Sequence, residues 1–149
     1  MVCALFKRSH FVTEKDLISP MYEQQRQKAI VIVGKNSENT ALLEMLLSAG
    51  SRYCIQTYHD AMEVFTSLDK IKCAHPILFL IHDDLPEISG TTLCERLYAL
   101  EAFRSVAMII ICSSIQETLE HEAKEKGVTL LQKPYSLDVL FSVITQHII

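Results

Sequence analysis

The sequence predicts an α/β fold in which a five-stranded parallel sheet lies between two layers of helices. Two observations lead to this prediction. Apolar runs alternate along the chain with longer segments whose apolar residues recur at helical spacing. Most of the apolar runs do not alternate with polar residues, which is typical of strands buried on both faces of a parallel sheet. The connections span only a few residues, so the alternation favours a three-layer sandwich.

The elements follow one another in a regular order. The expected strands are residues 29–33, 53–58, 76–81, 106–112 and 128–131, and a helix is expected after each of them. The second strand is less apolar than the others and is expected at a sheet edge. This placement fits a flavodoxin-like (βα)5 sandwich with strand order 2-1-3-4-5.

Polar residues and glycines mark the ends of the expected helices. Asn36 or Ser37 can cap the first helix, which stops near Gly50, while Asp60 is the expected N-cap of a single second helix through Leu68. The third and fourth helices are expected over 91–100 and 115–126, and the fourth stops at a glycine, residue 127. A serine at position 136 is the expected cap of the last helix.

Residues 1–27 differ in composition from the rest and are interpreted as an N-terminal extension. Polar residues interrupt its apolar ones, and a proline breaks the stretch. The extension is either a flexible tail or contains a short helix. The domain is expected to occupy residues 28–149, which leaves no room for an output domain after it.

Composition excludes several classes of protein. The 149 residues carry a formal net charge of -4, which argues against a nucleic-acid-binding face. No apolar run approaches the roughly 20 residues that a membrane-spanning helix needs. The five cysteines are odd in number and show no C-x-x-C spacing, so reduced thiols in a cytoplasmic protein are expected.

Polar residues follow four of the strands at the point where each strand ends. They are Gly34-Lys35, His82-Asp83-Asp84, Ser113-Ser114 and Lys133-Pro134. In an open parallel sheet, the carboxyl ends of the strands meet at one edge, where ligands bind. These residues are therefore the candidate site.

Two further features connect the pattern to a known family. One feature is the spacing of Pro86 and Gly90 after the third strand. The other is Lys133-Pro134-Tyr135, which precedes the capped last helix. With the fivefold alternation, residues 28–149 resemble the receiver domain (CheY-like) of two-component response regulators. The resemblance implies a non-enzymatic module of phosphorelay signal transduction.

The residues on which a receiver's phosphorylation depends are only partly present. By the resemblance, His82 stands in place of the phospho-accepting aspartate, and Gly34 and Lys35 stand in place of the acidic pair that holds Mg²⁺. Ser113 and Lys133 match the family. Leu130 replaces the usual aromatic switch residue. The pattern therefore resembles a degenerate receiver, or pseudo-receiver, without an acceptor.

The chemistry of these replacements argues against phosphorylation. Mg²⁺ requires oxygen ligands, whereas Gly34 has no side chain and Lys35 places an ammonium group at the metal position. Histidine cannot form an aspartyl phosphate. We therefore expect no catalytic residue, no bound metal and no Mg²⁺ cofactor, and we expect Lys35 or Lys133 to pair with Asp83 or Asp84.

These observations predict an atypical, stand-alone receiver domain that acts by phosphorylation-independent protein–protein interaction. Residual phosphotransfer to Asp83 or Asp84 stays open as an alternative. A flavodoxin-like small-molecule-binding domain is another, although residues 34–37 contain a single glycine and no phosphate loop. The sequence does not decide whether His82 senses pH.

The last helix carries apolar residues beyond those of a single core-facing stripe. Tyr135, Val139, Phe141 and Val143 are the expected interaction surface. The resemblance implies homodimerisation through the fourth helix, fifth strand and fifth helix. The sequence does not identify the partner or the pathway.

Overall fold

The computed structural model describes residues 28–50 and 52–148. The predicted N-terminal extension, residues 1–27, lies outside the described residues. Within them, five strands form one parallel sheet in the order β2-β1-β3-β4-β5, which confirms the predicted fold class. The strands are β1 (Ala29–Val33), β2 (Cys54–Tyr58), β3 (Pro76–His82), β4 (Ala107–Cys112) and β5 (Thr129–Gln132).

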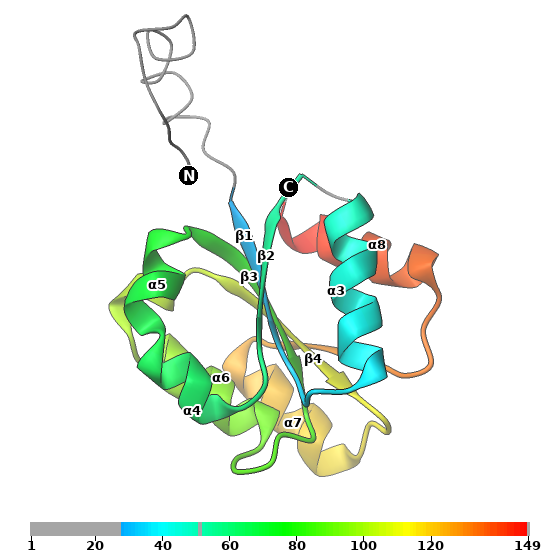
Figure 1. Cartoon of the computed structure of the whole chain (residues 1–149). Coiled ribbons are helices and arrows are strands. Elements are labelled where there is room, and N and C mark those ends of the chain that lie inside the picture. The colour runs from blue at the N-terminus through cyan, green and yellow to red at the C-terminus, as the bar shows by residue number, and fades with distance from the viewer. Residues whose placement is uncertain (1–27, 51, 149) are drawn as a thin grey trace, which may run out of the picture.

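Helices cover both faces of the sheet (Figure 1). One face carries α3 (Glu38–Gly50) and α8 (Leu137–Ile148), and the other carries α4 (Ala61–Thr66), α5 (Leu68–Cys73), α6 (Gly90–Tyr98) and α7 (Glu117–Lys126). A short 3-10 helix, η1 (Glu101–Phe103), precedes β4. None of the described helices has the length and apolar character needed to cross a membrane.

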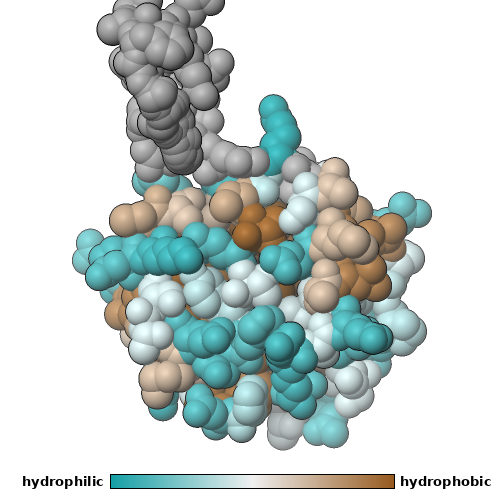
Figure 2. Space-filling view, viewed as in Figure 1, coloured by the Kyte–Doolittle hydropathy of each residue, from teal (hydrophilic) through white to brown (hydrophobic). Residues whose placement is uncertain are grey.

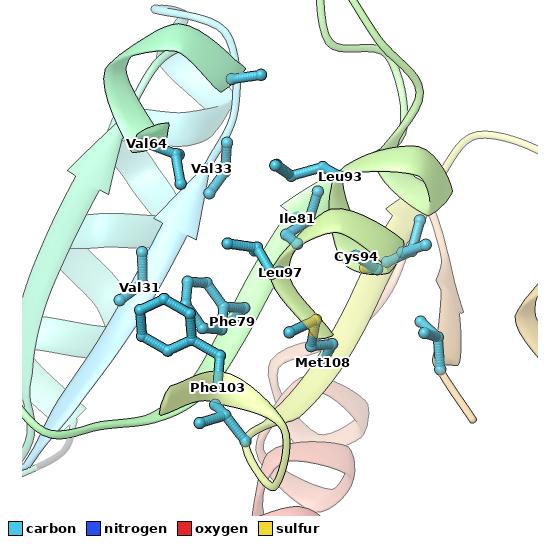
Figure 3. Close-up of a cluster of buried hydrophobic side chains, with 14 of the residues drawn as sticks. Val31, Val33, Val64, Phe79, Ile81, Leu93, Cys94, Leu97, Phe103 and Met108 are labelled. Carbon is cyan, nitrogen blue, oxygen red and sulfur yellow. The ribbon is translucent and has the colours of Figure 1, made fainter. Parts of the chain in front are cut away.

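The central strands supply both halves of the core because their side chains alternate between the two faces. Val31 and Val33 of β1 belong to the cluster under α4 to α7, in which the rings of Phe79 and Phe103 meet edge to face at 5.5 Å (Figure 3). Ile30 and Ile32 belong to the cluster under α3 and α8. Burial on both faces explains why these strands are continuously apolar in the sequence.

Local capping explains most helix ends. The Asp60 side chain accepts a hydrogen bond from the Glu63 amide at 2.7 Å, and the Ser136 hydroxyl accepts one from Val139 at 3.2 Å. Gly127 ends α7 in the left-handed conformation, with φ of 69°, which favours glycine. These three predicted boundary residues are confirmed.

Three helices differ from the prediction, and one of them, α6, ends at Tyr98, two residues earlier than expected. The helix after Asp60 is interrupted at Ser67, whose amide bonds to the Val64 carbonyl three residues back, so α4 and α5 are separate. The Thr66 hydroxyl donates to the Met62 carbonyl at 3.0 Å, where it competes with the backbone hydrogen bonds of a regular helix. Helix α7 begins at Glu117, two residues later than expected, and the preceding Ile115 is exposed.

Candidate functional site at the carboxyl edge of the sheet

The parallel register brings the predicted site residues to one edge of the sheet. Val33 pairs with Ile81, so Gly34 follows β1 beside the end of β3, where His82 stands. His82 pairs in turn with Ile111 of β4. Ser113 and Lys133 follow β4 and β5, and the Lys133 amide donates to the Cys112 carbonyl at 2.8 Å.

The His82 ring occupies the space beside Gly34 that a side chain there would need. A Cβ atom added to Gly34 would lie 2.5 Å from His82 Cδ2 and 3.0 Å from the Thr40 hydroxyl oxygen. These separations are shorter than van der Waals contact, so the ring and a side chain at position 34 exclude each other. The glycine and the histidine form a complementary pair although 48 positions separate them in the chain.

His82 is buried as a neutral ring. The residue is 5% exposed, and its Nε2 atom has no hydrogen-bond partner among the described residues. Burial lowers the pKa of His82, the Lys133 ammonium lowers it further, and Asp84 opposes both effects. A neutral imidazole with an unsatisfied nitrogen is unfavourable at this depth unless another group supplies a partner.

The predicted pairing of Lys35 is observed, but in an exposed position. Lys35 Nζ lies 3.6 Å from Asp84 Oδ2, and the two side chains are 55% and 60% exposed. An exposed pair of this kind contributes roughly 0–1 kcal/mol. Lys133, the second lysine considered for this pairing, forms no ion pair with any residue that the structure describes.

A small hollow, here called the polar pocket, lies between the ends of β3, β4 and β5. Its volume is about 240 Å³, and its lining includes Asp83, Asp84, Ser113, Ser114, Gln116 and Lys133. Cys112 also lines it, a residue that the sequence analysis missed because it reads as the last apolar residue of a strand. Burial and the nearby Asp83 raise the pKa of the Cys112 thiol, so the thiol is held protonated rather than activated.

A larger hollow, here called the α3–α8 groove, lies next to the polar pocket and is lined in part by His82. Its volume is about 620 Å³. Helix α3 contributes Asn39, Leu42, Leu43 and Leu46, and Lys133 to Tyr135 with Leu137 form the opposite wall. Ser113 and His82 complete the lining, so Ser113 and Lys133 border both hollows. Sequence reasoning did not find this groove, because its lining comes from four separate parts of the chain.

The side chains at this edge do not fit Mg²⁺. Gly34 offers no oxygen ligand from a side chain, and Lys35 carries a positive charge and reaches toward Asp84. Nowhere among the described residues do three His, Cys, Asp or Glu side chains gather as a metal site requires.

The predicted interaction surface is more buried than expected. Tyr135, Phe141 and Val143 are partly buried against the cluster under α3 and α8, and burial raises the pKa of Tyr135. The Phe141 ring lies next to Gly50 at the end of α3. Val139 is 45% exposed, so of these four residues it alone is largely available to a partner. Leu130 packs on the opposite cluster, under α4 to α7.

Two residues near the edge were also missed. His59 donates through Nδ1 to the Gly34 carbonyl at 3.0 Å, and its amide donates to the Glu63 carboxylate at 2.7 Å. Thr40 is buried at the start of α3 and lies within 3.3 Å of the Ser37 hydroxyl. Both hold the loop after β1 in place, and neither forms a recognisable motif in the sequence.

Comparison with known proteins places the fold. No protein-family model matches the sequence, and no curated protein matches it either. Solved structures do match. The signal receiver domain of an HD domain-containing protein from Pseudomonas fluorescens Pf-5 is 22% identical with a TM-score of 0.72, and the match covers 82% of this chain and 94% of that one.

Two further structures show the same likeness. A CheY-like response regulator receiver domain protein from Methanospirillum hungatei JF-1 is 21% identical, with a TM-score of 0.70 and coverage of 81% and 93%. The phosphorylated cyanobacterial phytochrome response regulator RcpA is 22% identical, with a TM-score of 0.67 and coverage of 81% and 91%. At these identities the likeness establishes that the chain has the flavodoxin-like fold of receiver domains.

Proposed function

We propose that this domain acts in cytoplasmic signal transduction as a receiver-like module that binds protein partners without being phosphorylated and without enzymatic activity. The fold shared with receiver domains supports a role in signalling. The packing of His82 against Gly34 is the observation that supports the absence of phosphorylation. It fills the acceptor position with a ring and leaves no room for an acidic side chain at position 34. Phosphoryl transfer depends on positioning and charge neutralisation, and Lys133 alone provides little of either.

A mass measurement tests the absence of phosphorylation. The protein is incubated with acetyl phosphate and Mg²⁺, and its intact mass is recorded. We expect no addition of a phosphate group. A receiver domain that is known to accept phosphate serves as the control for the donor, and the variant with Gly34→Asp, Lys35→Asp and His82→Asp shows whether the scaffold accepts a restored site. Addition of phosphate to the unmodified chain would contradict the proposal.

Residual phosphotransfer is a second candidate, favoured by one observation. Asp83 lines the polar pocket together with Ser113 and Lys133, two residues that match the receiver pattern. Asp84 lines it too, but its carboxylate faces Lys35. The same mass experiment decides this alternative, and peptide mapping assigns any phosphate to Asp83 or to Asp84.

Self-association through α7, β5 and α8 belongs to the proposal as one form of protein binding. Val139 on α8 supports it, since a side chain exposed to this extent is available to a second copy. Sedimentation velocity over a range of concentrations tests it, with Val139→Asp expected to weaken a dimer and Met62→Asp on α4 as the matched control. A chain that stays monomeric throughout would restrict the proposal to other partners.

A further inference from the structure

The α3–α8 groove has the dimensions and the lining of a small-molecule site. Its volume of about 620 Å³ falls in the range of roughly 300–1,000 Å³ that ligand pockets occupy. Four leucines line it, from α3 and from the start of α8. Leu42 is 49% exposed and Leu137 is 46% exposed, and both lose contact with water when the groove is filled.

Hydrophobic residues gather visibly on this side of the molecule. Figure 2 shows brown and tan residues on the right of the view, where α3 lies in Figure 1. Met45, one turn along α3 from Leu42, is also largely exposed. The groove therefore lies beside exposed apolar residues of α3.

Polar groups meet at one end of this apolar groove, where a ligand's head group would lie. His82 is part of the lining and is more than nine-tenths buried, yet its Nε2 atom has no hydrogen-bond partner among the described residues. Ser113 adds a hydroxyl group, and Lys133 adds an ammonium group without an ion-pair partner in the described chain. The hydroxyl group and the unpaired cation favour a ligand that accepts hydrogen bonds and carries negative charge.

The surrounding charges limit how much negative charge the ligand can carry. Helices α3 and α8 both have an acid in the first turn, Glu38 and Asp138, and Asp83 and Asp84 line the neighbouring polar pocket. One ammonium group at Lys133 balances a single carboxylate. A nucleotide or flavin with several phosphate charges would meet repulsion from these acids.

We infer that the α3–α8 groove binds a small amphipathic monoanion, a carboxylic acid with an aliphatic body. The carboxylate lies at Lys133 and Ser113, while the aliphatic body lies between Leu42, Leu46 and Leu137. Binding there gives the domain an input that requires no phosphorylation. The inference does not depend on the proposed function, because the groove is present whether or not an aspartate can be phosphorylated.

Titration of the full chain with decanoate, below its micelle-forming concentration, tests the inference. Backbone amide shifts in NMR spectra report both the affinity and the location of binding. We expect saturable shifts at residues of α3, at the end of β3 and at the start of α8. Lys133→Gln and Leu42→Ser are each expected to weaken binding on the order of tenfold, the change that about 1.4 kcal/mol produces.

Matched variants distinguish specific binding of decanoate in the groove from nonspecific adsorption to the protein surface. Met62→Ser removes an equally exposed methionine on α4, and Lys124→Gln removes a lysine on α7; both are expected to leave decanoate affinity unchanged. Decanol tests the head group and is expected to bind more weakly than decanoate. Unsaturable shifts, equal effects of the matched variants, or tighter binding of decanol than decanoate would each overturn the inference. A result against it leaves the phosphorylation experiment unaffected, since that experiment reads mass and not ligand binding.

Discussion

The polar pocket and the α3–α8 groove share Ser113 and Lys133 but differ in size and in the rest of their lining. The pocket is small and lined mainly by acids, hydroxyl groups and Lys133, whereas the groove is more than twice as large and has leucine walls. His82, at the position where the resemblance places an acceptor, lines the groove and packs against Gly34. The difference shows that one edge of a parallel sheet can carry two adjacent hollows of different chemical character.

Gly34→Ala tests the packing of the His82 ring against Gly34 and should have the largest effect on stability. The added Cβ would lie 2.5 Å from the His82 ring, so the ring must move away. Overpacking of this kind destabilises a protein by about 1–3 kcal/mol. Chemical denaturation measures the change in the free energy of unfolding.

A double-mutant cycle assigns that loss to the ring. In a His82→Ala background the same substitution should cost less, with a coupling energy of at least ~1 kcal/mol. Gly127→Ala is the matched control, because a φ of 69° and an open surrounding give it a backbone cost of about 1 kcal/mol that does not depend on His82. Equal costs of Gly34→Ala in both backgrounds would show that the ring does not occupy this space.

The response of His82 to pH is expected to be the next largest effect. Its pKa is lowered in the folded state, so the unfolded chain, with a histidine pKa of about 6.5, binds the proton more readily. Stability should therefore fall as the pH falls below about 6.5 and continue to fall until the folded pKa is reached, with a slope of at most about 1.4 kcal/mol per pH unit.

Denaturation curves recorded between about pH 7.5 and 5 measure this slope. The range spans the pKa of about 6.5 that a histidine has in the unfolded chain. His82→Leu should flatten the curve at acid pH and cost little at neutral pH, because it removes both the titration and the unsatisfied nitrogen. The control is His121→Gln, an exposed residue whose ring lies 3.5 Å from Glu125. Identical slopes for the parent chain and His82→Leu would rule out a neutral, buried His82.

Lys35→Ala should have the smallest effect on stability. It tests how little the exposed Lys35–Asp84 ion pair contributes. The Lys35–Asp84 pair is more than half exposed, so its removal should lower stability by less than about 1 kcal/mol, and added salt should reduce the difference further. Thermal unfolding at low and high salt measures it. A larger, salt-insensitive loss would mean that Lys35 has a packing role that its exposure does not indicate.

Site prediction from the sequence succeeded where position along a strand was sufficient. The edge that collects Gly34, His82, Ser113 and Lys133 was predicted correctly, and so was the pairing of Lys35 with Asp84. The expected ion pair of Lys133 is not formed with any described residue. A lysine side chain is long, and several acids are within its reach, so its partner cannot be deduced from spacing.

The apolar residues of α8 illustrate the same limit. Helical spacing placed Phe141 and Val143 outside a single core-facing stripe, but both pack against the cluster under α3. Phe141 reaches the end of α3 because Gly50 leaves space for its ring. Which side of a helix is covered depends on the neighbouring helix, and this was not visible in the local pattern.

The sequence alone determined the fold class, the helix caps at Asp60 and Ser136, and the edge where the site lies, whereas the strand order only fitted its pattern. These features depend on local propensities and on apolar runs, which are properties of short stretches of chain. The tertiary structure alone decided that the His82 ring packs on Gly34, that its Nε2 atom is left without a described partner, and that α3 and α8 enclose a groove. These features depend on the distances between side chains that folding brings together from remote parts of the chain, and no local pattern encodes such distances.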